Sequence, residues 1–462
     1  MNKASKATAT LVLLTGFMAS ALAAEQPEQP AQAEPSEPAE QVEQAAQPLP
    51  PLTVEEAYQS ALERNYALQS QEFIYRAEKE GVREAWGALL PQVEATAGYG
   101  VSEYTRDFDL QSSITENDAH SRYDLSVNQV VYSRRTFENL DRAKAMESLA
   151  ADELHAYRLN IGYLAVEAYL QAAQLHAEAL IIEREVENHE KRLQQLDSMR
   201  ERGFASRADS LDAQARIDEV RAEYTALQSN YRAALKHLEA VTGLELDERE
   251  LSNIPTHAWQ ATPTLIARDW VPLALANSGD VQKARGELSV AEATHDVERG
   301  AFWPELYLTA RYTNNDTYAT NLREEARLEL QLRLPLYKGG SNLARARQAK
   351  ERIHAGRYQL QDTENLVRVQ VATVSEELRG SYSRIHSLRA AQESASAALQ
   401  ASERGFVGGV RSLNELLDSR NRVSRVERSL AAELHTNLLL QFKLRQTAGT
   451  LSAADISSVF GS

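Results

Sequence analysis

The apolar and polar positions of the chain alternate in four short segments. Each of the first and third segments begins just after a proline, Pro91 and Pro304. A period of two predicts a strand with one apolar face. We therefore predict four strands of about ten residues, the length that crosses a bilayer when tilted. The alternating runs are 93–101, 125–132, 306–312 and 328–336, with polar loops predicted at 105–121 and 313–325.

A long helical pattern follows each pair of strands. Residues 136–200 contain no proline and one glycine, and residues 341–404 contain no proline and two glycines. Between Val367 and Leu388, apolar residues recur at the coiled-coil spacing. A helix of about 65 residues spans about 100 Å, which exceeds a compact domain. Shorter helices are predicted at 53–89 and 267–302, before the strands, and at 208–241 and 410–448, after the long helices.

The same landmarks occur twice in the same order. Leu90-Pro91-Gln92 and Glu201-Arg202-Gly203-Phe204 in the first half match Trp303-Pro304-Glu305 and Glu403-Arg404-Gly405-Phe406 in the second. Such self-similarity predicts an internal duplication. We divide the chain into a first structural repeat (53–243), an equatorial connector (244–266), a second structural repeat (267–449) and a C-terminal tail (450–462).

The N-terminal segment has the composition of a secretory signal. Lys3 and Lys6 precede an apolar stretch that ends in Ala21-Leu22-Ala23, so residues 1–23 are predicted to be a signal peptide. An N-terminal membrane anchor is the alternative, although the apolar stretch is short for one. Residues 24–52 are rich in Pro and Glu and are predicted to form a disordered linker.

Charge and residue types exclude several classes of function. The formal net charge of -16 argues against nucleic acid as a partner. The chain has no cysteine, which excludes disulfides, Cys-ligated metals and thiol nucleophiles. Its ten histidines show no metal-ligand spacing, and no common catalytic motif is present. We expect a protein that is not an enzyme and has no cofactor or metal site.

Four membrane strands imply an assembly. Strands exposed to lipid must close into a barrel, because an open edge leaves backbone groups unpaired in hydrocarbon. Four strands cannot close alone, and two chains would give a barrel filled by side chains. Three chains would give twelve strands around a lumen, with the long helices continuing below as a coiled wall. A water-soluble antiparallel sheet explains the same alternation equally well.

The chain resembles the TolC family of outer-membrane efflux and secretion ducts over about residues 52–452. The resemblance rests on the doubled proline entry into a strand, on Leu332-Arg333-Leu334-Pro335-Leu336-Tyr337-Lys338-Gly339-Gly340, and on the run from Arg404 to Leu413. It implies a mainly α protein with a membrane β part: a homotrimer with a 12-stranded β-barrel and a helical coiled-coil barrel in the periplasm. It also implies outer-membrane lipid, a periplasmic adaptor (membrane fusion) protein and an inner-membrane transporter as partners.

The resemblance assigns roles to residues near the second helical turn. Glu415 and Asp418 match a pair of acidic residues that ring the periplasmic entrance, although negative charge is favourable near a helix N-terminus in any case. Arg411 matches an arginine that holds the entrance closed, with Asp212 near its acidic partner; two solvated charges are the alternative. Gly408 and Gly409 fit the adaptor-docking pattern. The first repeat lacks this glycine pair, because Phe204-Ala205-Ser206-Arg207 stands in its place.

The predicted function is an exit duct of a tripartite efflux pump or a type I secretion system. The sequence does not separate drugs from secreted proteins as cargo, because the inner-membrane partner selects it. The alternative is a periplasmic coiled-coil adaptor or scaffold without a membrane barrel.

Overall fold

The computed structural model describes residues 50–108, 112–203, 206–246, 250–252, 254, 257–316 and 324–460. The predicted signal peptide (1–23) and all but the last three residues of the predicted linker (24–52) lie outside the described residues. Leu52, the last of these linker residues, belongs to the fold. It is fully buried, its N–H donates to the Glu250 carbonyl, and its carbonyl accepts from the Ser252 N–H.

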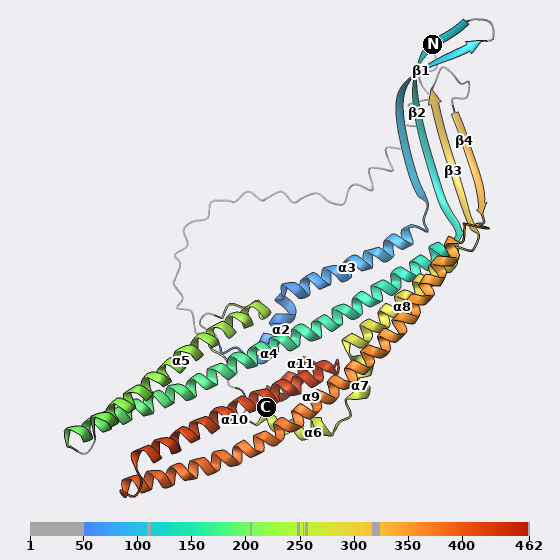
Figure 1. Ribbon diagram of the computed structural model, residues 1–462. Helices are drawn as coiled ribbons and strands as arrows, with labels where there is room; N and C mark the ends of the chain where they lie inside the picture. Colours follow the sequence, from blue (N-terminus) through green and yellow to red (C-terminus); the bar gives the residue numbers. More distant parts are fainter. Residues whose placement is uncertain are drawn as a thin grey trace, which may run out of the picture. The chain divides into compact units, whose positions relative to one another are not determined.

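The chain is mostly helical, and one order of elements occurs twice: helix, two strands, long helix, return helix (Figure 1). The elements are α2 (Val54–Arg64), α3 (Tyr66–Gly87), β1 (Gln92–Phe108), β2 (Ser112–Ser133), α4 (Arg134–Glu201), α5 (Arg207–Thr242), η1 (Ala258–Ala261), α6 (Thr262–Ala267), α7 (Val271–Asn277), α8 (Gly279–Gly300), β3 (Glu305–Asp316), β4 (Glu324–Arg333), α9 (Ser341–Val407), α10 (Leu413–Thr447) and α11 (Ala453–Phe460).

The four strands form one antiparallel sheet in the order β1-β2-β3-β4. The predicted strand length is wrong for the first hairpin, whose strands have 17 and 22 residues. Its register continues to the pair Phe108 and Ser112, so most of the predicted loop 105–121 is strand. The predicted loop 313–325 also gives residues at both ends to β3 and β4. Ladder hydrogen bonds join backbone groups, so a strand can outlast the apolar alternation of its side chains.

The helices predicted at 53–89 and 267–302 are each broken in two. Asn65 ends α2 and caps α3, because its side-chain oxygen accepts from the N–H groups of Ala67 and Leu68. The same side chain donates to the Val241 carbonyl, 176 residues away. The second break lies at Ser278, between α7 and α8. At Asn65 the side chain offers the backbone a local alternative to a continuous helix, whereas Ser278 makes no such side-chain bond to α8.

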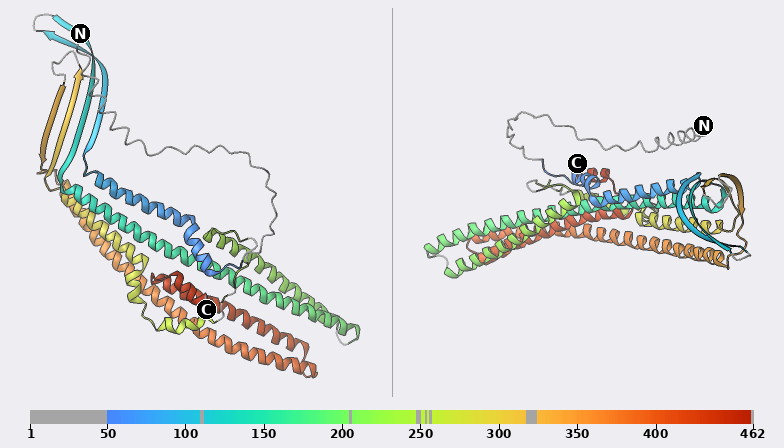
Figure 2. Two further views of the ribbon diagram at one scale, coloured as in Figure 1. Left: turned by 180° about the vertical axis from the view of Figure 1, so that it is seen from behind. Right: turned by 90° about the horizontal axis from the view of Figure 1, so that it is seen from above.

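The helices pack in a row (Figures 1 and 2). On the side of the sheet the order is α3-α4-α8-α9, and beyond the breaks it is α5-α4-α10-α9. In the described part of the chain, no helix combines the length and the apolar character needed to cross a bilayer.

The apolar core lies where the connector and both termini of the described fold meet. Tyr169 and Phe442 are fully buried there, and the Tyr169 hydroxyl donates to the carbonyls of Leu52 and Ser252. The predicted tail 450–462 contributes a helix, α11, whose Phe460 stacks on Phe442 at a ring distance of 6.0 Å. The apolar side of this helix is buried by α2 and by Phe442 of α10, so the helix depends on segments distant in sequence.

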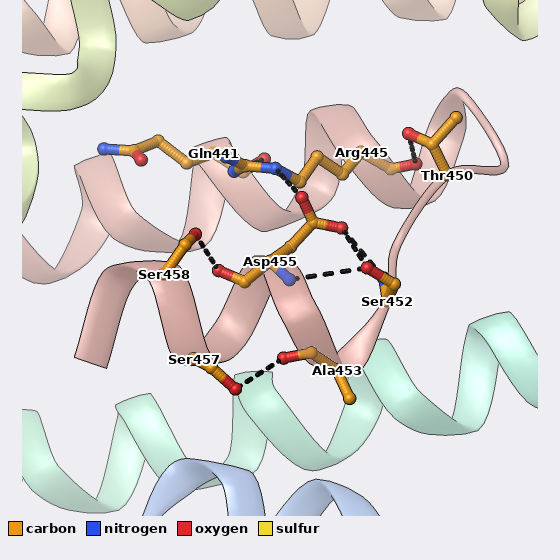
Figure 3. A network of polar contacts seen from close by, with 8 residues as sticks. All are labelled: Gln441, Arg445, Thr450, Ser452, Ala453, Asp455, Ser457 and Ser458. Atoms are coloured by element: carbon orange, nitrogen blue, oxygen red, sulfur yellow. Dashed lines mark hydrogen bonds and ion pairs between the residues drawn. The ribbon is translucent and has the colours of Figure 1, made fainter. Parts of the chain in front are cut away.

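A polar contact fixes α11 to α10 (Figure 3). The Arg445 Nε donates to the Asp455 carboxylate at 3.1 Å, and the same carboxylate accepts from the backbone and hydroxyl of Ser452. Burial lowers the pKa of Arg445, while the nearby Asp455 raises it. We call this contact, together with α11, the C-terminal clasp.

Candidate functional site

The two helical hairpins end in turns at 202–206 and 408–412, which we call the first and second hairpin turns. In the second, the N–H groups of Val410 and Arg411 both donate to the Gly405 carbonyl. Gly409 has a φ of +72°, a backbone region that glycine enters without strain. The turn therefore closes α9 with its own backbone groups.

Both return helices begin with a capping box. The Ser412 hydroxyl accepts from the Glu415 N–H at 3.3 Å, and the Glu415 carboxylate accepts from the Ser412 N–H at 2.9 Å. Ser206 and Asp209 make the same reciprocal pair at 3.2 and 2.9 Å. Hydrogen bonds from the Ser206 backbone and hydroxyl lower the pKa of Asp209. These pairs satisfy backbone donors that the first turn of a helix leaves open.

The two capping boxes give equivalent helical positions in the two return helices. Ser206 and Ser412 are equivalent, so Asp209 corresponds to Glu415 and Asp212 to Asp418. Sequence reasoning missed Asp209, although the spacing Ser-x-x-Asp/Glu at both helix starts could have found it.

Glu415 and Asp418 lie one helical turn apart near the start of α10, and both side chains are exposed. The Glu415 carboxylate accepts from the Ser412 N–H of its own helix cap. Asp418 has no hydrogen bond or ion pair within the described residues. The Asp418 carboxylate is therefore free to bind another group, whereas one oxygen of the Glu415 carboxylate already accepts a hydrogen bond from its helix cap.

Arg411 contacts the body of its own hairpin. Its Nη1 donates to the buried Ser402 hydroxyl at 2.7 Å, and Ser402 in turn pairs with Ser419 at 3.0 Å. No ion pair joins Arg411 to Asp212 among the residues that this single chain describes. Asp212 is exposed on α5.

Gly408 and Gly409 are exposed between two exposed valines, Val407 and Val410. A Cβ built on Gly409 meets no heavy atom within 4 Å. In the first hairpin turn, Gly203 has a φ of +79° and is likewise open. Phe204 and Ala205 lie outside the described residues. The second turn therefore presents a flat surface with apolar flanks.

Charged side chains that the sequence did not single out join the two hairpins. The buried Arg192 of α4 lies over the Phe406 ring of α9 at 5.0 Å, and its Nη1 donates to Gln195 at 2.7 Å. Its Nε and Nη2 have no partner. Burial, and secondarily the charge of Arg420, lowers the pKa of Arg192. No local sequence pattern predicts this contact, because it joins helices that are far apart in sequence.

A second buried charge lies on the same side of α4. Glu185 is close to His189 at 3.7 Å and to Arg216 of α5 at 3.6 Å. A hydrogen bond from His189, followed by the charges of Arg428, His189 and Arg216, lowers the pKa of Glu185 against its burial. One carboxylate oxygen of Glu185 has no hydrogen-bond partner. Within the described residues, no group of acidic residues and histidines could hold a metal ion.

The sheet has one apolar and one polar face. The cross-strand neighbours Val127, Ala310 and Leu328 belong to the apolar face, where most leucines of β4 are exposed. On the polar face, Asp124 accepts from Thr313 at 2.8 Å and lies 3.5 Å from Arg311. The polar residues Arg311, Glu329, Gln331 and Arg333 share this face by register.

At the two ends of the row of elements, the outer edges of β1 and β4 have no paired strand among the residues that the structure describes. At one end are the free edge of β1 and α3, on which Tyr66 and Phe73 are exposed. At the other end are the free edge of β4 and α9, on which Tyr358, Leu366 and Val369 are exposed.

The family model described as outer membrane efflux protein matches residues 57–244 and 270–450. The chain is 25% identical over 415 residues to the outer membrane protein TolC of Vibrio cholerae, covering 87% of this chain and 92% of the relative. It is 25% identical over 431 residues to the alkaline protease secretion protein AprF of Pseudomonas aeruginosa, covering 87% and 86%.

The fold is similar to that of the outer membrane protein VceC of Vibrio cholerae, with a TM-score of 0.73 at 18% identity. The match covers 86% of this chain and 96% of the solved one. The matched proteins are efflux and secretion proteins rather than enzymes. They also favour the duct over the alternative of an adaptor or scaffold without a membrane part.

Proposed function

The chain belongs to the outer membrane efflux protein family, a family of outer-membrane channels, and from this membership we propose that three copies form one continuous duct. The observation that carries the proposal is the pair of unpartnered ends of the row. A free strand edge and exposed apolar side chains at each end suit a head-to-tail contact between copies. A head-to-tail contact closes into a ring when its rotation permits.

The two faces of the sheet suit opposite surroundings. Three copies would supply twelve strands, enough for a lumen. The apolar face with the exposed leucines of β4 would contact lipid, and the polar face around Asp124 and Arg311 would line water. The repeated order of elements supports the division into two duplicated repeats joined by the connector and closed by the C-terminal clasp.

The duct would work between other proteins. The relatives include both an outer membrane protein of a toluene efflux pump and an alkaline protease secretion protein. We therefore propose a periplasmic adaptor and an inner-membrane transporter as partners, with cargo chosen by the transporter. Gly408 and Gly409, with the flanking exposed valines, are the proposed adaptor-docking surface.

Glu415 and Asp418 are the proposed periplasmic gate. Three copies would place six carboxylates around the opening, and Asp418 is free to bind a cation. In planar bilayers, the E415A/D418A variant is expected to lose most of the block by divalent cations added on the periplasmic side. D418N alone should lose more of it than E415Q, because Glu415 also caps its helix. Unchanged block in E415A/D418A would contradict the gate assignment. Failure of the wild-type protein to form channels would contradict the duct.

Arg411 and Asp212 are the proposed latch, formed between copies, since one chain does not join them. Breaking the latch should raise the closed-state conductance. R411A also removes the hydrogen bond to Ser402, so the test is a double-mutant cycle of R411A and D212A in the same recordings. Additive effects would show that the two residues do not interact.

A further inference from the structure

Exposed aromatic side chains mark the level at which the strands become helices. They occur at all four strand–helix junctions and comprise Trp86, Tyr132, Phe137, Phe302, Trp303 and Tyr337. The Tyr132 and Phe137 rings are 6.4 Å apart, and Tyr132 pairs with Leu306 on the apolar face of the sheet. Trp and Tyr gather where a membrane meets water. We call these residues the junction belt.

Basic side chains accumulate directly beyond the junction belt. Residues 333–352 contain six basic residues and one acidic residue, in a chain whose formal net charge is -16. Within the described residues, none of the five cations Lys338, Arg345, Arg347, Lys350 and Arg352 forms an ion pair, and all are exposed. Other exposed arginines of the helices commonly pair with an acid three or four residues away, as Arg83 does with Glu80.

We propose that these five cations, which we call the α9 basic segment, bind anionic phospholipid headgroups of the leaflet that faces the periplasm. The proposal rests on the proposed function, because it requires the sheet to be the membrane part. The junction belt places the first turns of α9 at headgroup depth. Negative lipid surfaces attract basic residues beside a membrane segment, and the attraction acts over about one Debye length.

Arg134, the first residue of α4, is a basic residue at the same strand–helix junctions and contacts the junction belt. Its guanidinium lies over the Trp303 ring at 5.4 Å and pairs with Glu138 at 2.7 Å. An arginine neutralised in this way needs no external anion. The α9 basic segment differs because Glu351, the only acidic residue in the sequence 333–352, forms no ion pair in the described part of the chain, and none of the five cations pairs with an acid of α8 there. An anion from outside the chain is therefore the complement that it lacks.

The test titrates the detergent-solubilised assembly with short-chain phosphatidylglycerol and, in parallel, with short-chain phosphatidylcholine. The R345Q/R347Q/K350Q/R352Q variant is expected to lose the preference for phosphatidylglycerol by about tenfold or more, since each basic residue near a lipid surface contributes about fivefold. The matched control R207Q/R232Q/R422Q/R425Q removes four exposed arginines of α5 and α10 that form no ion pair within the described residues, and it should retain the preference.

The variant R345K/R347K/K350R/R352K changes the same four positions but keeps their charge, and it should bind as the wild type does. It separates loss of charge from misfolding caused by substitution at these positions. Equal preference in the Gln variant and its control would overturn the proposal. Displacement of the lipid by inorganic phosphate alone would also overturn it, because that result indicates a free phosphate site. Channel formation in pure phosphatidylcholine bilayers tests the duct separately and does not depend on this surface.

Discussion

The region around the connector and the region near the hairpin turns bury charge in different ways. In the C-terminal clasp, the Arg445 guanidinium donates through Nε to Asp455 and through Nη1 to the Gln441 carbonyl. Near the hairpin turns, Arg192 is equally buried but has two nitrogens without partners. A satisfied buried pair resists separation, whereas an uncompensated buried charge weakens the contact that contains it. The comparison indicates a fixed region at the connector and a separable one at the turns.

The largest effect is expected in the clasp. Asp455→Asn leaves the Arg445 guanidinium buried without its carboxylate and should lower the free energy of unfolding by about 3 kcal/mol. Urea unfolding followed by circular dichroism measures this loss. Glu187→Gln breaks an exposed pair with Lys191 and should change stability by less than about 0.5 kcal/mol. Equal losses in the two variants would contradict the fixed character of the clasp.

The opposite sign is expected near the turns. Arg192→Met removes the under-partnered charge, keeps apolar packing against Phe406 and should raise the free energy of unfolding by about 1 kcal/mol. Arg192→Lys retains a buried charge and should give no gain. The same unfolding measurement applies to both variants. A loss of stability in Arg192→Met would show that the cation contributes more than it costs.

The smallest effect concerns the helix caps. Ser206→Ala and Ser412→Ala each remove one capping box and should each cost about 0.5–1 kcal/mol. Because the boxes have the same geometry, the two losses should be similar. Hydrogen exchange in the first turns of α5 and α10 localises the effect. Faster exchange throughout α4 and α9 would indicate that the caps stabilise more than their own helices.

Several predictions that depend on neighbours in sequence were accurate, whereas the breaks at Asn65 and Ser278 and the length of the first hairpin were not predicted. The two long helices and their return helices begin and end within a few residues of the predicted bounds. The strands β1 and β3 begin just after the two prolines, as predicted. The family follows from the same landmarks and is confirmed by the match to outer membrane efflux proteins. These sequence patterns are local, because the helix period, the strand alternation and the capping residues lie within the element or a few residues from it.

Tertiary structure decided what depends on distant segments. The hairpin of β1 and β2 extends beyond the alternation because each strand supplies the other's hydrogen bonds. The tail folds as α11 because α2 helps to bury its apolar side, and Arg192 of α4 lies over the Phe406 ring of α9. By itself, the sequence determined the kinds of element, their order and the family. Pairing across more than a hundred residues depends on which surfaces meet, and only the packed chain fixes those contacts.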